Sequence, residues 1–434
     1  MHEQLQPMTT LPARAIRGEI SVPGDKSVSH RSIMFGSLAN GTTRITNFLR
    51  GEDNFSTMAA FRAMGVAIDD DGQTVTVNGV GLHGLHEPDN VLDCGNSGTT
   101  IRLMTGLLSG QRFFSVVTGD QYLRKRPMKR VTEPLSRMGA CINGRGGGPL
   151  APLAISGASL SGITYQSPIA SAQVKSSLML AGLYAAGATV ITEPTLSRDH
   201  SERMLRHFGA SLETSGTTVT LQGGQELQGR DISVPGDISS AAFLLVAALI
   251  VPGSELLILN VGVNPTRTGV LDILQAMGGD IVLQNQREVS GEPVADLLVR
   301  SSRLKGIEIG GEVVPRAIDE FPAICVAAAL AEGTTILRDA RELRVKETDR
   351  IAAMAANLRM IGAGAIEETE DGMIIQGREE LVGGEVTSFG DHRIAMSLSV
   401  AALACRGPVT VDDVSCVATS FPGFFDLLQK VAIR

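Results

Sequence analysis

Several stretches of this sequence place cations and hydroxyl groups at the start of an apolar helix, an arrangement suited to binding anions. Residues 24–31 read GDKSVSHR and run into an apolar segment, so Lys26, Ser27 and Arg31 fall at a predicted helix start. Free backbone N–H groups and the positive end of the helix dipole favour an anion at such a place. The alternative is an ordinary N-cap with exposed charges.

Two more predicted helix starts carry small or polar residues. Residues 95–102 read GNSGTTIR, in which small side chains would bring the backbone close to a ligand. This is not a Walker loop, which needs a GxxxxGK string followed by Ser or Thr. Residues 171–175 read SAQVK. Arginines near three helix starts oppose the dipole, which indicates that anions are held there: Arg31, Arg102 and Arg393.

Two further segments are more charged than their surroundings. Residues 124–130 read RKRPMKR, and residues 343–350 read LRVKETDR. In a helix, Lys346 and Arg350 would share one face, with Glu347 beside them. For either segment taken alone, a solvated charged face is the alternative. Acids also precede the last two apolar helices, where an N-cap is their ordinary role: Asp319, Glu320 and Asp391.

These helix starts belong to a repeated unit. Six times, an apolar helix-like run ends at a glycine and is followed by a strand-like run, at Gly41, Gly110, Gly187, Gly253, Gly333 and Gly407. The spacings are 69, 77, 66, 80 and 74 residues. Most units add a second helix-like segment and two more strands. Because the polar residues before each first helix differ between copies, we expect the copies to build one composite site.

The six copies fall into two halves of three. The hexapeptide ISVPGD occurs at 20–25 and again at 232–237, 232 − 20 = 212 residues later. We therefore predict one domain over residues 21–232 and a second over 1–20 and 233–434, with hinge crossovers near the two hexapeptides. First helices such as AAFLLVAALIV have no polar face and should be buried, whereas the amphipathic second helices should lie outside. The predicted class is α/β.

Composition narrows the possible partners. The chain is 43% hydrophobic and carries a net charge of −8, which argues against binding to nucleic acid or to anionic membranes. The longest apolar run, 241–251, is too short to span a membrane, and the N-terminus does not resemble a signal peptide, so a cytoplasmic protein is expected. Five cysteines without CxxC spacing predict reduced, buried thiols. His83 and His86 are expected in a surface loop rather than at a metal.

Taken together, the motifs resemble those of one family, the 5-enolpyruvylshikimate-3-phosphate (EPSP) synthases. In family order, from residue 20 to the C-terminus, they read PGDKSVSHR, GNSGTTIR, KRPM, SAQVKS, SRDHSERML, IDEFP, RVKETDRIAAM, DHRIAM and TSFPGFF. The resemblance implies two similar domains of three βαβαββ units each, an inside-out α/β barrel-like enolpyruvyl transferase fold. It also implies transfer of the enolpyruvyl group of phosphoenolpyruvate to the 5-hydroxyl of shikimate 3-phosphate, releasing phosphate, on the route through chorismate to the aromatic amino acids. No metal or organic cofactor is implied, and we expect a monomer.

The resemblance also implies roles for individual residues. Expected contacts to shikimate 3-phosphate come from Lys26, Ser27, Arg31, Ser171, Ala172, Gln173, Arg198, Asp319 and Lys346. Expected contacts to phosphoenolpyruvate come from Lys26, Asn96, Gly98, Arg126, Gln173, Glu347, Arg350 and Arg393. The acid–base pair would be Asp319 and Glu347, and Lys26 completes the catalytic set. Two carboxylates would move the protons, while the cations stabilise two polyanionic substrates.

Departures from the enteric-type pattern place the chain with the family's second class. Thr419 stands where a lysine is often found, and Ser171-Ala172-Gln173 replaces a double serine before the glutamine. Glyphosate is therefore a possible inhibitor, and the sequence does not determine how strongly it inhibits. Two alternatives remain. The sister enzyme acting on UDP-N-acetylglucosamine would need a reactive loop cysteine, which neither Cys94 nor Cys141 provides. A non-catalytic anion-binding module would have no use for two acids among its cations.

Overall fold

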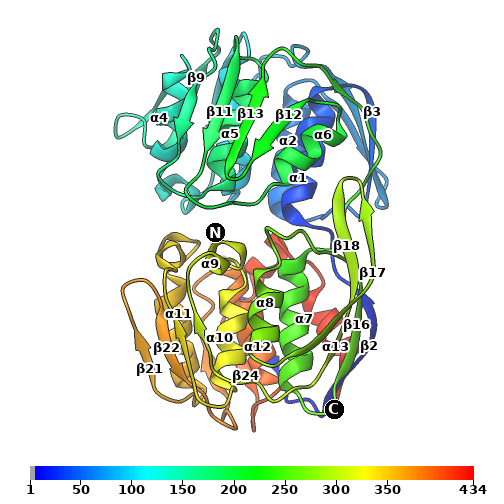
Figure 1. The fold of residues 1–434 in the computed structure, drawn as a ribbon, viewed down its shortest axis with the longest axis vertical. Coiled ribbons are helices and arrows are strands. Elements are labelled where there is room, and N and C mark those ends of the chain that lie inside the picture. The colour runs from blue at the N-terminus through cyan, green and yellow to red at the C-terminus, as the bar shows by residue number, and fades with distance from the viewer. Residues whose placement is uncertain (1–4) are drawn as a thin grey trace. The chain divides into compact units, whose positions relative to one another are not determined.

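The computed structural model describes residues 5–434, which divide into two compact units. The first unit comprises Gly24–Val234 together with the short segment Val289–Glu292. The second unit comprises the chain up to Pro23, Pro235–Glu288 and Pro293–Arg434. Within each unit, helices lie inside and sheets lie around them (Figure 1).

The first unit holds three sheets, one for each repeat. Their strand orders are β14 (Leu227–Gln228)–β3 (Ala39–Thr46)–β5 (Thr74–Val80)–β4 (Ala67–Asp70), with β15 (Ile232–Ser233) also on β3; β6 (Leu92–Asp93)–β7 (Phe114–Thr118)–β9 (Leu150–Ser156)–β8 (Cys141–Arg145); and β10 (Thr164–Gln166)–β11 (Ala188–Thr192)–β13 (Thr218–Gln222)–β12 (Leu212–Ser215). In every sheet, the strand that follows the first helix is antiparallel to one neighbour and parallel to the strand or strands on its other side. Parallel neighbours need a crossover connection, and the first helix of each of the last two repeats provides it.

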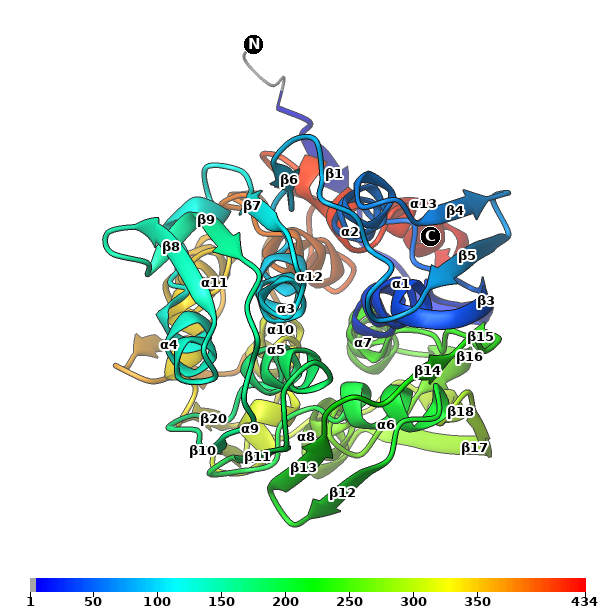
Figure 2. The ribbon, with the colours of Figure 1, turned by 90° about the horizontal axis from the view of Figure 1, so that it is seen from above.

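The first helices of the three repeats fill the middle of the unit. They are α1 (Lys26–Leu38), α3 (Gly98–Ser109) and α5 (Ala172–Gly182), and from Val28, Thr100 and Val174 onward their residues are buried. Figure 2 shows them nearly end-on, with the sheets outside. The second helices lie further out and have exposed faces: α2 (Glu52–Ala63), α4 (Lys129–Arg137) and α6 (His200–His207).

The second unit repeats this plan with strands borrowed from the N-terminal segment. Its sheets are β17 (Asp280–Val289)–β18 (Glu292–Arg300)–β16 (Glu255–Gly262)–β2 (Ala15–Ser21)–β25 (Ala432–Ile433); β19 (Glu308–Ile309)–β20 (Thr334–Leu337)–β22 (Met373–Gln376)–β21 (Ile366–Glu368); and β1 (Met8–Thr10)–β24 (Val409–Val411)–β23 (Gly384–Val386). The N-terminal strand β2 is parallel to β16, with Ile20 opposite Ile258. The preceding strand β1 is antiparallel to β24.

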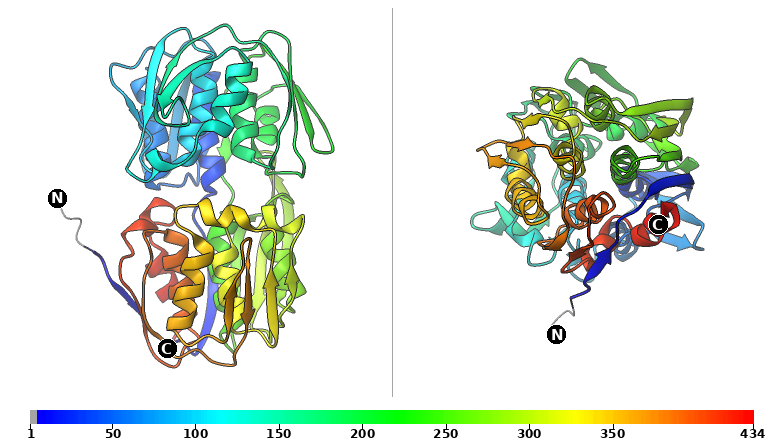
Figure 3. Two further views of the ribbon diagram at one scale, coloured as in Figure 1. Left: turned by 90° about the vertical axis from the view of Figure 1, so that its left-hand side faces the viewer. Right: turned by 90° about the horizontal axis from the view of Figure 1, so that it is seen from below.

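The inner helices of the second unit are α7 (Ile238–Ile250), α10 (Phe321–Ala329) and α12 (His392–Ala402), which contact one another. They appear in green, yellow and orange near the middle of the right-hand view of Figure 3. Their partners further out are α8 (Gly269–Ala276), α11 (Arg350–Met360) and α13 (Phe424–Val431), and the short α9 (Val313–Arg316) precedes α10. All residues of α7 except the last are buried, which agrees with an apolar run without a polar face.

The predicted order of elements and the α/β class are therefore confirmed. His83 and His86 are exposed, in the loop after β5. The prediction of buried thiols is wrong for Cys141, which is exposed at the start of β8, an edge strand of its sheet. Within residues 5–434, no helix has both the length and the apolar character that crossing a membrane requires.

Candidate active site

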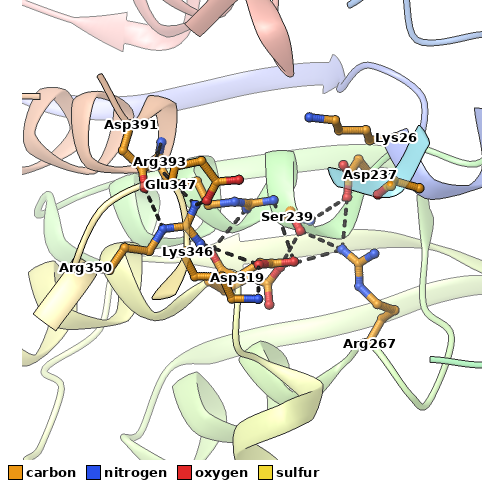
Figure 4. A network of polar contacts seen from close by, with 12 residues as sticks. Lys26, Asp237, Ser239, Arg267, Asp319, Lys346, Glu347, Arg350, Asp391 and Arg393 are labelled. Carbon is orange, nitrogen blue, oxygen red and sulfur yellow. Dashed lines mark hydrogen bonds and ion pairs between the residues drawn. The ribbon is translucent and has the colours of Figure 1, made fainter. Parts of the chain in front are cut away.

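In the second unit, three cations surround the carboxylate of Asp319, the residue two positions before α10. Arg350 Nη1 lies 3.5 Å and Lys346 Nζ 3.7 Å from Asp319 Oδ1. Arg393 contacts Asp319 twice, with Nη2 4.0 Å from Oδ2 and Nη1 donating to the main-chain oxygen at 3.1 Å. Figure 4 shows these side chains converging from the ends of three elements. The acidic side chain of Asp319 is therefore surrounded by three cationic side chains.

Arg350 is the fixed centre of this cluster. Its side chain is 1% exposed, and Nε donates to Asp391 Oδ2 at 2.8 Å. Its Nη2 donates to Glu347 Oε2 at 2.6 Å. Burial favours the neutral form, but the charges of Asp391 and Glu347 outweigh it and raise the pKa of Arg350 above its usual value. Asp391 also caps α12 through Arg393 N, so one carboxylate fixes both arginines.

Lys346 and Glu347 reach this cluster from a loop. The prediction that 343–350 is helical, with Lys346 and Arg350 on one face, is wrong. A 3-10 helix ends at Val345, Lys346 is extended, and α11 begins only at Arg350, after the N-cap Asp349. The Asp349 side chain accepts from Ala352 N, which stops the helix from extending backwards. Burial lowers the pKa of Lys346, and the Asp319 carboxylate opposes that effect.

In the first unit, Lys26 begins α1 and pairs with an acid that the sequence analysis did not single out. Lys26 Nζ lies 2.5 Å from Asp53 Oδ2, and Asp25 caps the helix through Val28 N. Arg31, one turn further on, is buried and donates to three neutral oxygens, those of the Ser201 and Ser176 hydroxyls and of a main-chain carbonyl. Burial lowers the pKa of Arg31 to about 10. These hydrogen bonds go to neutral groups, while the charges of Asp25 and Glu202 act on Arg31 from nearby.

Four predicted residues gather between the starts of α3 and α5. Arg126 Nη2 donates to Asn96 Oδ1 at 2.6 Å, and Gln173 Oε1 accepts from Arg102 Nη1 at 2.7 Å. A Cβ placed on Gly98 would lie 2.7 Å from Arg102 Nη1 and 3.2 Å from Arg126 Nη1. The backbone of Gly98 therefore faces two guanidinium groups at close range, as expected for a glycine beside an anion site.

The remaining predicted residues of the first unit lie at the starts of α5 and α6. Ser171 caps α5 through Val174 N, and Ala172 is the first helical residue. Arg198 lies two residues before α6. Ser27, in the first turn of α1, is half-buried. These four residues thus lie at or just before a helix start, whereas Arg126 follows a 3-10 helix over Leu123–Lys125.

The comparisons with known proteins agree with this geometry. The family model for EPSP synthase (3-phosphoshikimate 1-carboxyvinyltransferase) matches residues 11–428. The chain belongs to the EPSP synthase family. A relative of that enzyme name from Geobacter sulfurreducens is 72% identical over 98% of this chain and 99% of its own length. One from Geobacter metallireducens is 70% identical over 99% and 100%. A solved EPSP synthase from Acinetobacter baumannii has a TM-score of 0.89 and 51% identity, covering 99% of this chain and 98% of its own.

Family membership confirms the resemblance and the fold class predicted from the motifs. The sequence analysis missed the acids that orient the cations: Asp53, Asp120, Asp391 as a partner of Arg350, and Glu193. Asp120 accepts from the Asn96 side chain at 2.7 Å and from two backbone N–H groups of the Arg126 loop. Asp53, Asp391 and Glu193 each have a partner far away in sequence, namely Lys26, Arg350 and Ser171. Among residues 5–434, no three His, Cys, Asp or Glu side chains are arranged to hold a metal ion.

Acid should destabilise the first unit through His30. This histidine is fully buried, with Nδ1 2.7 Å from Thr57 Oγ1. Burial, then the charges of Lys26 and Arg31, lowers its pKa well below the usual 6.5. Below about pH 6.5 the unfolded chain binds a proton that the folded chain does not, so the free energy of unfolding falls by about 1.4 kcal/mol per pH unit until the folded-state pKa is reached.

Urea unfolding between pH 5 and 8 measures this effect. The three tyrosines, Tyr122, Tyr165 and Tyr184, all lie in the first unit and the chain has no tryptophan, so tyrosine fluorescence reports on that unit. In the parent, the free energy of unfolding should fall with decreasing pH below about pH 6.5. We expect His30→Asn to reduce that slope by the equivalent of about one proton, and His83→Asn, at an exposed position, to leave the slope unchanged. Equal slopes in all three proteins would contradict the burial of a neutral His30.

Proposed function

We propose that the residues described above carry the reaction of the EPSP synthase family in this chain. That reaction transfers the enolpyruvyl group of phosphoenolpyruvate to shikimate 3-phosphate in the shikimate pathway, which leads to the aromatic amino acids. Asp319 and Glu347 are the acid–base pair, and Lys26 is the third catalytic group. The observation that carries this assignment is the pair of carboxylates among Lys346, Arg350 and Arg393.

The chemistry explains why acids are needed among cations. C3 of phosphoenolpyruvate must gain a proton while the attacking 5-hydroxyl loses one, which gives a tetrahedral intermediate. Loss of a proton from C3 and departure of phosphate then restore the double bond. Asp319 and Glu347 are half-buried, and both contact Arg350, so two proton carriers share one rigid support. Proton transfer of this kind contributes about 10²–10⁴ in rate.

Binding is assigned to the cations and polar groups at the helix starts. Phosphoenolpyruvate contacts come from Lys26, Asn96, Gly98, Arg126, Gln173, Glu347, Arg350 and Arg393. Shikimate 3-phosphate contacts come from Lys26, Ser27, Arg31, Ser171, Ala172, Gln173, Arg198, Asp319 and Lys346. Planar guanidinium groups suit phosphate and carboxylate alike, which favours arginine at these positions. The domain boundaries predicted from the twin hexapeptides, a monomeric state and a cytoplasmic location are further parts of this proposal.

A phosphate-release assay tests the activity directly. Phosphate should appear only when shikimate 3-phosphate and phosphoenolpyruvate are both present. Release of phosphate with UDP-N-acetylglucosamine as the acceptor would favour the sister enzyme. That enzyme needs a reactive cysteine, and Cys94 is unsuited to the role because it is buried and burial raises its pKa. Substrate binding without release would indicate an anion-binding module.

Glyphosate should compete with phosphoenolpyruvate, and Gly98→Ala should weaken glyphosate more than the substrate. The added Cβ would lie 2.7 Å from Arg102 Nη1 and 3.2 Å from Arg126 Nη1, so both guanidinium groups would have to shift to admit it. A longer ligand in the same pocket has less room to accommodate that shift. The measurement is the ratio of the inhibition constant to KM in parent and variant. Equal weakening of both ligands would place Gly98 outside the pocket, and an insensitive parent would show that other residues already exclude glyphosate.

A further inference from the structure

A buried group of three charges lies behind the start of α5. Lys175 Nζ is 2.9 Å from Glu193 Oε2 and 2.8 Å from Glu202 Oε1, and the three side chains are at most 4% exposed. Lys175 also donates to the main-chain oxygen of Ser197 at 3.4 Å. With no exposed face and two carboxylates in contact, Lys175 serves as an internal counterion rather than a ligand for substrate. Despite burial, the two carboxylates raise its pKa, so it stays charged.

Glu193 uses its remaining acceptor capacity on two substrate-binding segments. Ser171 N donates to Glu193 Oε1 at 2.9 Å, at the N-cap of α5. Ser197 donates to Glu193 Oε2 through its hydroxyl at 2.8 Å and its backbone N–H at 3.4 Å. Ser197 directly precedes Arg198. One carboxylate therefore joins the segment 171–173 to the segment 197–198, which are otherwise separated by a helix and a strand.

The surrounding contacts make this link rigid. Lys175 lies on α5 and Glu202 on α6, so the charged group also joins the two helices that follow the segments. Hydroxyls of Ser176 and Ser201 meet at 2.7 Å between the same helices, and both accept from Arg31. A binding site needs its contacts held to about half an ångström, and locked supporting groups achieve this.

We propose that Glu193 is a positioning residue for shikimate 3-phosphate, holding the 171–173 and 197–198 segments at the spacing that the substrate requires. The proposal rests on the assignment of Ser171, Gln173 and Arg198 to that substrate. Glu193 itself does not touch the ligand. Its carboxylate sets where the α5 start and the Arg198 backbone lie.

Glu193→Gln is the main test, because glutamine keeps the shape but has a single acceptor oxygen, which can serve either Ser171 N or the Ser197 and Lys175 donors and not both sets. We expect the Kd for shikimate 3-phosphate, measured by calorimetry, to rise about tenfold or more. The KM for phosphoenolpyruvate at saturating shikimate 3-phosphate should rise less than the Kd for shikimate 3-phosphate, because Gln173 is the only residue of the two segments that is also assigned to phosphoenolpyruvate, and kcat should stay within about threefold. Ser197→Ala, which leaves the three charges in place, should give a smaller rise in the same Kd.

Two controls separate the positioning role of Glu193 from a loss of stability and from an error in the assigned substrate site. Met204→Ala, a core change on α6, should lower the thermal midpoint while leaving the Kd unchanged, which accounts for lost stability alone. Arg198→Ala tests the assignment itself, and an unchanged Kd there would overturn the proposed site. If Arg198→Ala weakens shikimate 3-phosphate but Glu193→Gln and Ser197→Ala do not, the positioning role of Glu193 is wrong. Equal losses for both substrates would also overturn it.

Discussion

Asp319→Asn and Glu347→Gln should each lower kcat by about 10²–10⁴, with much smaller changes in KM. Asparagine keeps the shape of Asp319 and leaves its main-chain oxygen bonded to Arg393, so the cluster should keep its geometry. What is lost is a carboxylate that can accept and return a proton. The measurement is steady-state phosphate release with both substrates varied.

Asp349→Asn is the matched control for these two variants. Asp349 adjoins the cluster, but its side chain caps α11 and pairs with Arg344 instead of facing Asp319. Asparagine is also a good N-cap, so kcat should stay within about twofold. If Asp319→Asn and Glu347→Gln raise only KM, the two acids bind substrate and the acid–base assignment is wrong.

Lys26→Met should lower turnover by about 10²–10³-fold, the range for losing one group that stabilises developing charge. Methionine keeps the apolar stem, so the loss is of an ammonium group and not of packing. The complication is Asp53, which would lose the partner 2.5 Å away and become a buried, uncompensated acid.

The double variant Lys26→Met with Asp53→Asn resolves that complication. If the ammonium group acts on substrate, removing the orphaned acid should not restore turnover. Recovery to near the parent rate would show that Lys26 only neutralises Asp53. Circular dichroism and thermal melting of each variant would show whether the fold is intact.

Much of this molecule was predictable because its information is local. A helix start shows in a short string such as GDKS or DHR, and a repeat shows in spacing, so the six first helices and their polar N-termini could be located. Partners far along the chain could not. Nothing near Glu193 in sequence indicates that it accepts from Ser171 N, 22 residues away, and Asp391 reads as an N-cap although it also holds Arg350.

The LRVKETDR segment shows a second limit. Its residues have adequate helix propensity, and the four-residue spacing of its cations fits a helix face. The Asp349 side chain competes by capping the following turn, so the helix starts later than propensity alone indicates. Lys346 still reaches Asp319, and Glu347 still reaches Arg350, but both do so from a loop. The predicted helical geometry was therefore wrong, although Lys346, Glu347 and Arg350 do lie in one cluster.

The N-terminal strands of the second unit impose an order on folding during synthesis. Thr9 of β1 pairs with Thr410, and Ile20 of β2 with Ile258, so neither strand has its partner when it leaves the ribosome. At about 5–20 residues per second, β2 waits roughly 10–50 s for β16, while nearly all of the first unit can already fold. An unpaired strand is prone to aggregation, which charges along it oppose. Arg17 and Glu19, both exposed in the finished sheet, are suited to oppose aggregation of β2 during that interval.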